Sequence, residues 1–196
     1  MSGRRLAQGA MWVPMVLLVL SVGANVLQAR KIFSLVDPSV PRHSRVGKTV
    51  APIQLQSPDG SRHVVRFNTG VPTVVYFFSP TCGWCERNWD NVRALAAASD
   101  GRYRVIAVAG ETNLTAFREA HPLPSIEVFG GLTAESQAAL GLSSTPHTLV
   151  VSAQGLVSHD WVGAYQGTVL RELEDLLNVS LPGLIAPPAP PRHEPQ

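Results

Sequence analysis

The sequence predicts an α/β fold with a central mixed β-sheet flanked by helices, and three observations lead to this prediction. Residues 73–78 form an unbroken run of β-branched and aromatic side chains, which is typical of a central strand covered on both faces. Apolar residues recur at helical spacing directly after this run. Strand and helix patterns then alternate, so the expected order is a hairpin, β-α-β-α and finally β-β-α.

A β-hairpin is expected at the start of the domain. Residues 53–55 alternate between apolar and polar side chains, Asp59-Gly60 is a strong turn signal, and residues 63–67 supply the return strand. Because Pro52 has no N–H to donate to a neighbouring strand, it indicates an edge position.

The first helix of the domain is expected from Cys82 to Ala98, after the central strand ends at Ser79-Pro80. Thr81 is a suitable N-cap, and Asp100-Gly101 closes the helix. One face of this helix carries the apolar residues Cys85, Trp89, Val92 and Leu95 or Ala96.

The remaining elements are apolar runs bounded by proline and glycine. They are a strand at 104–109, helices at 113–120 and 133–140, a hairpin of strands at 148–152 and 156–162, and a closing helix at 168–177. Residues 46–180 are therefore expected to form one domain.

The segment before the domain is expected to enter a membrane. No charged residue occurs from Leu6 to Ala29, and the apolar part of this run approaches the roughly 20 residues that a membrane span requires. Arg4 and Arg5 precede it as in an export signal, and small residues allow cleavage after Ala24. Residues 1–29 are therefore interpreted as a membrane anchor or a cleaved signal segment. The anchor is favoured because the uncharged run is longer than the core of a signal peptide.

Two further segments are expected to lack a packed core. Residues 30–45 contain prolines and mixed charges and are interpreted as a tether between membrane and domain. Residues 181–196 contain six prolines and are interpreted as a disordered tail.

Composition excludes several classes of function. The chain has 16 basic and 14 acidic residues, for a net charge of +2, and no long basic stripe, so no nucleic-acid partner is expected. Its two cysteines both lie in the motif Cys82-Gly83-Trp84-Cys85. This count excludes a framework of several disulfides and a four-cysteine zinc site.

The Cys-Gly-Trp-Cys motif predicts redox chemistry. It lies where a buried strand ends and a helix begins, so Cys82 meets the unpaired N–H groups of the helix N-terminus, which stabilise a thiolate. Cys85 follows one helical turn later, deeper in the domain and within bonding reach of Cys82. We therefore predict that Cys82 attacks a substrate disulfide and that Cys85 resolves the resulting mixed disulfide.

Three alternatives to this chemistry are weaker. Two core cysteines at helical spacing would leave Cys82 exposed at the tip of a helix. Half of a metal site needs two further ligands, and the histidines show no pair at ligand spacing, so no metal is expected. In peroxiredoxins a Ser or Thr stands three residues before the cysteine and a proline four residues before that; Ser79 fits the first condition, but Val75 does not fit the second.

Three separated segments carry a family resemblance. They are residues 46–60, residues 74–85 with the two cysteines, and residues 145–163 with Thr145-Pro146 and Gly155. Together they make residues 46–178 resemble the membrane-anchored TlpA/ResA-type thioredoxin-like proteins. The resemblance implies a thioredoxin-like fold and no cofactor besides the Cys82–Cys85 disulfide. It also implies that Pro146 is a cis-proline facing the cysteines and that the backbone of Thr145 pairs with an extended substrate.

The chain departs from the thioredoxin pattern at two positions. Tyr76 stands where thioredoxins often carry a buried acid, so the proton acceptor for Cys85 is unassigned. The dipeptide Gly83-Trp84 replaces the Gly-Pro of thioredoxins. Because this dipeptide tunes the reduction potential, the protein is either a reductant or an oxidant of its clients. Trp84 is expected to present an apolar face to substrate. His147 either steadies a thiolate or is an exposed loop histidine.

The resulting prediction is a thiol-disulfide oxidoreductase of the bacterial cytoplasmic membrane with its domain in the periplasm, or an exported protein if the N-terminal segment is cleaved. Expected partners are cysteine-containing exported proteins and a membrane electron donor or acceptor. The resemblance favours a reductant in cytochrome c maturation, and residues 77–82 are also similar to accessory proteins that mature methylamine dehydrogenase. The alternatives are a thioredoxin-like adaptor without redox turnover and a thiol peroxidase.

Overall fold

The computed structural model describes residues 14–28, 45–57 and 59–184. The chain forms two compact units, Met1–Arg42 and His43–Gln196. In the first unit, residues 14–28 are helical. No helix within the described residues combines the length and the apolar character needed to cross a membrane. Residues 1–13 and 29 of the predicted anchor and residues 30–44 of the predicted tether lie outside the described residues.

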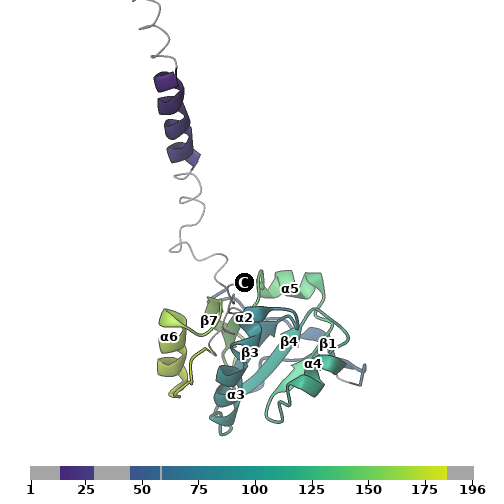
Figure 1. The fold of residues 1–196 in the computed structure, drawn as a ribbon. Coiled ribbons are helices and arrows are strands. Elements are labelled where there is room, and N and C mark those ends of the chain that lie inside the picture. The colour runs from purple at the N-terminus through teal and green to yellow at the C-terminus, as the bar shows by residue number, and fades with distance from the viewer. Residues whose placement is uncertain (1–13, 29–44, 58, 185–196) are drawn as a thin grey trace, which may run out of the picture. The chain divides into compact units, whose positions relative to one another are not determined.

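The second unit contains a five-stranded mixed sheet with the strand order β5-β4-β3-β6-β7 (Figure 1). Its strands are β3 (Thr73–Phe78), β4 (Arg104–Ala109), β5 (Glu127–Phe129), β6 (His147–Val151) and β7 (Val157–Val162). Strands β3, β4 and β5 are parallel, whereas β6 is antiparallel to β3 and to β7. The predicted central strand is confirmed, because every residue of β3 is buried.

The predicted N-terminal hairpin is also confirmed. It consists of β1 (Ile53–Gln56) and β2 (Arg62–Val65), which pair antiparallel and form a sheet of their own. The helices of this unit are α2 (Gly83–Glu86), α3 (Trp89–Ala97), α4 (Thr115–Ala120), α5 (Ala134–Leu140) and α6 (Gly167–Leu177).

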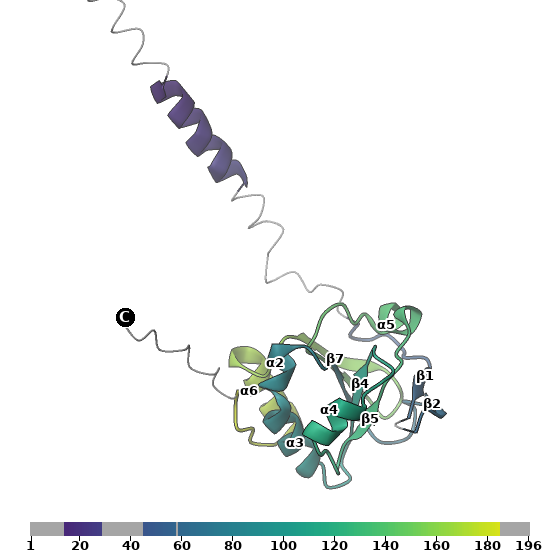
Figure 2. The same ribbon diagram turned by 45° about the vertical axis from the view of Figure 1, so that its right-hand side comes forward.

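Two apolar clusters lie on opposite faces of the sheet. Alternation along β3 sends Val74, Tyr76 and Phe78 into the cluster that α3, α4 and α6 cover. Val75 and Phe77 join the other cluster, to which the hairpin and α5 contribute. Figure 2 shows α5 and the hairpin on the side of the sheet away from α3 and α6. Burial on both faces stabilises the central strand, at roughly 1.5–3 kcal/mol for each large apolar side chain.

The predicted helix over residues 82–98 is in fact two helices. α2 ends at Glu86, and α3 begins at Trp89 after Arg87 and Asn88. At the break the Asn88 N–H donates to the carbonyl of Cys85, and the buried Asn88 side chain bonds to Tyr76 and Tyr165. Both helices still bury the predicted face, which includes Cys85 and Trp89.

The strand β5 was not predicted from the sequence, because three residues are too few to show an alternating pattern.

The predicted boundary of the C-terminal tail needs correction. The expected tail includes residues 181–184, yet Leu181 is buried and its N–H donates to Glu174 Oε1 at 2.8 Å. The N–H of Gly183 donates to Asn91 Oδ1 at 2.8 Å, so the packed domain extends past residue 180. Residues 185–196 lie outside the described residues.

Candidate active site

The cysteine pair lies at the carboxyl end of β3. Cys82 and Cys85 are joined by a disulfide with their Cα atoms 5.2 Å apart. Cys82, and not the predicted Thr81, is the N-cap of α2, and its Sγ accepts a hydrogen bond from the Cys85 N–H at 3.2 Å. An N–H directed at this sulfur stabilises negative charge on it, which is the property that an attacking thiolate needs.

The two sulfurs differ in depth, as predicted. Cys82 is half-buried, whereas Cys85 is only 1% exposed and belongs to the same apolar cluster as Tyr76 and Trp89. A partner molecule therefore has access to Cys82 and not to Cys85. This asymmetry agrees with an attacking and a resolving cysteine.

Trp84 forms an exposed apolar surface beside the disulfide. Its side chain is 49% exposed, and the guanidinium carbon of Arg87 lies 4.6 Å from the centre of its ring. The geometry therefore leaves the predicted substrate-facing surface of Trp84 open to solvent, and Arg87 holds the ring from one side.

Acidic groups lie near the cysteine loop. Ser79, at the start of this loop, donates from Oγ to Glu111 Oε1 at 2.7 Å. Glu86 follows Cys85 directly, and its Oε2 lies 3.1 Å from Nε2 of His121 at the end of α4. Sequence patterns did not single out Glu111 or His121, because each comes to the loop from a distant part of the chain.

The predicted substrate loop lies at the same end of the sheet. His147 pairs with Phe77 in the β3–β6 register, so Thr145-Pro146 lie beside the end of β3 from which the cysteine loop leaves. The Thr145–Pro146 peptide bond is cis, as the resemblance implies. The carbonyl of the buried Pro146 accepts from the Gly163 N–H at 2.8 Å. The half-exposed Thr145 has no main-chain hydrogen bond within the described part of the chain, so its backbone is open to a ligand.

His147 fits neither of its predicted descriptions. It is 1% exposed, and its Nε2 bonds to Asp160 Oδ1 instead of contacting a sulfur. Its neighbours on the same face of β6, Leu149 and Val151, belong to the apolar cluster on the side of the sheet opposite Cys85. The prediction of an exposed loop histidine fails because Asp160, on the neighbouring strand β7, compensates the burial of the imidazole.

A buried network of polar groups connects β3, the start of α3 and Tyr165. Asn88 Nδ2 donates to the Tyr76 hydroxyl at 3.2 Å, and Asn88 Oδ1 accepts from Asn91 Nδ2 at 2.9 Å and from the Tyr165 N–H at 3.1 Å. Burial raises the pKa of Tyr76, so its phenol stays protonated at neutral pH. In the sequence, this hydrogen-bond network is indicated by two asparagines, Asn88 and Asn91, on the apolar face of the predicted helix.

Within the described residues, no three side chains of His, Cys, Asp or Glu cluster as metal ligands.

Comparison with solved structures identifies proteins with a similar fold. No family model and no curated protein matches the chain. The solved structures that are similar include the exposed lipoprotein thioredoxin Etrx1 of Streptococcus pneumoniae, with a TM-score of 0.54 and 17% identity over 64% of this chain and 99% of that one. StoA of Bacillus subtilis has a TM-score of 0.52 and 16% identity over 64% and 96%. The thioredoxin domain of a thiol-disulfide oxidoreductase from Bacteroides vulgatus has a TM-score of 0.53 and 15% identity over 68% and 98%. The predicted thioredoxin-like fold is thereby confirmed.

Proposed function

We propose that the protein is a thiol-disulfide oxidoreductase that exchanges disulfides with other proteins through Cys82 and Cys85. The observation that carries this proposal is the unequal exposure of two bonded cysteines at the N-terminus of one helix, in a thioredoxin-like fold. A structural disulfide would gain nothing from an accessible sulfur that accepts a main-chain N–H.

In the reducing direction, the thiolate of Cys82 attacks a client disulfide. A mixed disulfide forms, and the first client sulfur leaves as a thiolate. Cys85 then loses its proton and attacks the Cys82 sulfur, which closes the protein disulfide and releases the second client sulfur. In sum, two electrons and two protons pass from the protein dithiol to the client, and the oxidising direction is the reverse.

The proton of Cys85 does not pass to Tyr76 in this scheme. A phenol whose pKa is raised by burial is a poor proton acceptor at neutral pH, and it already accepts a hydrogen bond from Asn88. The client thiolate that leaves first is a stronger base than the neutral phenol of Tyr76, and it is released next to the reacting sulfurs. It therefore accepts the proton of Cys85 in this scheme.

The proposed location of the protein and the proposed client proteins rest on the sequence. The uncharged run over residues 6–29 supports attachment to a bacterial cytoplasmic membrane, or export if this segment is cleaved, with the domain on the periplasmic side. Clients are then exported proteins with cysteines, cytochrome c precursors among them, and a membrane redox partner resets the disulfide. Charged flanks of the segment give no clear orientation, so a reporter active only outside the cytoplasm, fused after Gln196, tests the placement.

The chemistry is tested by insulin reduction with the purified chain. We expect thiol-dependent turnover that Cys82→Ser abolishes, and no turnover with hydrogen peroxide. An adaptor without redox function gives no turnover with either substrate, and a thiol peroxidase prefers the peroxide. The reduction potential of the Cys82–Cys85 couple then decides between reductant and oxidant.

A further inference from the structure

Glu111 places a carboxylate beside the cysteine loop, residues 79–82, and the exchange proposed above makes no use of it. Its position follows from the sheet. β3 and β4 are parallel, and Phe78 pairs with Ala109, so the chain leaves both strands at the same edge. Ser79 follows β3 directly and Glu111 lies two residues beyond β4, which brings their side chains within hydrogen-bond distance.

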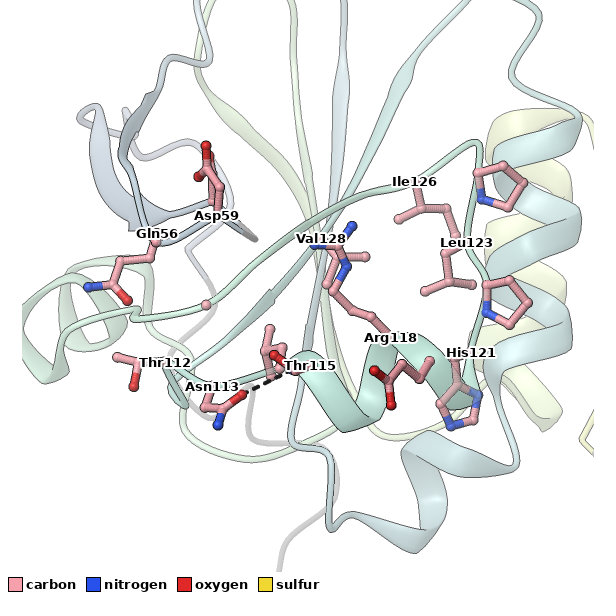
Figure 3. A pocket seen from close by; sticks show the side chains of 17 residues that line it. Gln56, Asp59, Thr112, Asn113, Thr115, Arg118, His121, Leu123, Ile126 and Val128 are labelled. Atoms are coloured by element: carbon pink, nitrogen blue, oxygen red, sulfur yellow. Dashed lines mark hydrogen bonds between the residues drawn. The ribbon is translucent and has the colours of Figure 1, made fainter.

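The main chain at Glu111 is held by the segment that follows β5. Its carbonyl accepts from the Gly131 N–H at 2.9 Å. Residue 130 has to be glycine for this approach, because a Cβ there would collide with the same carbonyl oxygen. Thr112 and Asn113 follow Glu111 and line a cleft of about 870 Å³ beside β5, which Glu111 does not line (Figure 3). The carboxylate therefore reaches the cysteine loop from a fixed backbone.

The hydrogen bonds of Ser79 have a defined direction because Glu111 is their final acceptor. An ionised carboxylate only accepts, so the single hydroxyl proton of Ser79 goes to Glu111 Oε1, at 2.7 Å. The lone pairs of Ser79 Oγ then face Thr81, whose hydroxyl and N–H lie at 3.2 and 3.4 Å. Both of these groups of Thr81 therefore donate to Ser79.

The same turn fixes Cys82. The Ser79 carbonyl accepts from the Cys82 N–H at 3.1 Å, which closes a four-residue turn with Pro80 at its second position, where proline is favoured. Cys82 leaves this turn as the N-cap of α2, and its Sγ accepts from the Cys85 N–H at 3.2 Å. Ser79 thus connects Glu111 to the residue whose sulfur attacks.

Reduction of the disulfide removes one of the constraints on Cys82. In the oxidised protein the bond to Cys85 holds the sulfur at α2, and the turn holds the backbone. In the reduced protein that bond is absent, so the hydrogen bonds of the turn carry more of the constraint. Because fixing a loop costs conformational entropy, these bonds influence how often the sulfur of Cys82 meets the N–H that stabilises it.

We propose that Glu111 is a positioning residue for disulfide exchange. By accepting from Ser79, it keeps the turn of the reduced protein in the conformation in which the Cys85 N–H points at the Cys82 sulfur. The thiolate is then stabilised in the place from which it attacks. The effect on exchange rests on the proposed function, whereas the effect on the turn does not.

The charge of Glu111 acts in the opposite direction to its hydrogen bond. A negative charge near a thiolate disfavours the thiolate, so loss of the charge alone should make Cys82 slightly more reactive. Glu111→Gln and Glu111→Ala both remove the charge, but only Gln keeps an oxygen that accepts from Ser79. Comparison of these two variants therefore isolates the hydrogen bond.

The rate of exchange of the reduced full chain with oxidised glutathione tests the proposal. The protein dithiol and one oxidised glutathione give the protein disulfide and two molecules of reduced glutathione, so electrons and protons balance. We expect the rate constant to be about three- to tenfold lower in Glu111→Ala than in Glu111→Gln, because a hydrogen bond contributes a free energy of that order. Ser79→Ala should lower the rate constant of the parent by the same factor.

Two further variants supply controls. Adding Glu111→Ala to Ser79→Ala should not lower the rate constant further, because both changes remove the same hydrogen bond. Asp175→Ala, which removes an exposed carboxylate on α6, should leave the rate constant at the value of the parent. If Glu111→Ala does not fold, Ser79→Ala removes the same hydrogen bond from its other end and replaces it in the comparison.

Amide hydrogen exchange measures the turn without any redox reaction. In the reduced ¹⁵N-labelled full chain, the Cys82 N–H should exchange with solvent faster in Glu111→Ala than in Glu111→Gln, because its hydrogen bond to Ser79 opens more often. Equal rate constants of glutathione exchange in Glu111→Gln and Glu111→Ala, or a further loss in the double variant, would overturn the proposal.

The two measurements separate this proposal from the proposed function. If the parent exchanges with glutathione and neither measurement distinguishes Glu111→Gln from Glu111→Ala, only the positioning role is wrong. If the Cys82 N–H responds as expected and the parent does not exchange with glutathione, Glu111 still holds the turn, and the proposed function is wrong.

Discussion

Nε2 of His147 lies 2.6 Å from Oδ1 of Asp160, and both side chains are buried, with 1% and 6% of their surfaces exposed. The second carboxylate oxygen of Asp160 accepts from the Arg45 N–H at 3.0 Å. Asp160 thus connects β6, β7 and the start of the described domain. Since His147 directly follows Pro146, the pair also fixes the strand that presents the predicted substrate loop.

Asp160→Ala is expected to destabilise the protein by about 1–3 kcal/mol, because it leaves the buried imidazole without its hydrogen-bond partner. The Arg45 N–H loses its acceptor in the same variant. Urea unfolding of the purified chain measures the effect.

The matched control is Asp90→Ala, which removes an exposed ion pair with Arg93. We expect that change to cost less than about 1 kcal/mol, because solvent screens both partners. Similar losses from the two substitutions would show that the His147–Asp160 pair stabilises the fold no more than a surface pair does.

Tyr76→Phe should leave the rate of disulfide exchange within a few-fold of the parent. The substitution removes the acceptor for Asn88 Nδ2, so we expect a loss of about 1–3 kcal/mol in the free energy of unfolding. Stopped-flow exchange with a small disulfide measures the rate. A hundredfold slower reaction in a folded variant would mean that the phenol takes part in the chemistry.

Alkaline pH should weaken the fold through Tyr76 and Tyr165, the two most deeply buried tyrosines. Burial raises the pKa of Tyr76 and of Tyr165, whereas in the unfolded chain each phenol titrates near 10. Above about pH 10 the unfolded state releases protons that the folded state keeps, so stability falls by about 1.4 kcal/mol per pH unit for each group. Below that pH both states are protonated and this contribution does not change.

Urea unfolding between pH 9 and 11 measures this slope. The double variant Tyr76→Phe, Tyr165→Phe should show a shallower fall than the parent, although it is less stable at neutral pH. Parallel slopes in the two proteins would mean that these phenols ionise as readily in the fold as outside it.

The sequence predicted the parts of the fold that depend on local pattern. The all-apolar run of β3 and the glycine and proline boundaries were sufficient for the order of the main elements and for the position of Cys82 and Cys85 between β3 and a helix. β5 was missed because its three residues show no period, and the break at Asn88 was missed because the apolar spacing runs on without interruption from Cys85 to Leu95.

The candidate site was predictable to a similar extent. The resemblance identified Pro146, which is cis in the structure. It did not place His147, because the burial of a histidine depends on a carboxylate thirteen residues away on the next strand.

The roles of the two cysteines give the most direct prediction from the site. Cys82 is half-buried with its sulfur at the helix N-terminus, whereas Cys85 is 1% exposed. In the reduced protein, limited alkylation near pH 6 should therefore label Cys82 first, because only an accessible thiolate reacts quickly. Mass spectrometry of the labelled peptides identifies the order.

Replacing each cysteine in turn tests the same roles in cells. Cys85→Ser keeps the attacking thiolate and removes the resolving step, so mixed disulfides with client proteins should accumulate. Cys82→Ser removes the attack and should trap little, which makes it the matched control. If Cys82→Ser trapped clients and Cys85→Ser did not, the roles would be reversed, and the N–H that Cys85 donates to the Cys82 sulfur would not determine which cysteine attacks. If neither variant trapped clients and the parent failed to exchange with a small disulfide, the adaptor alternative would replace the oxidoreductase.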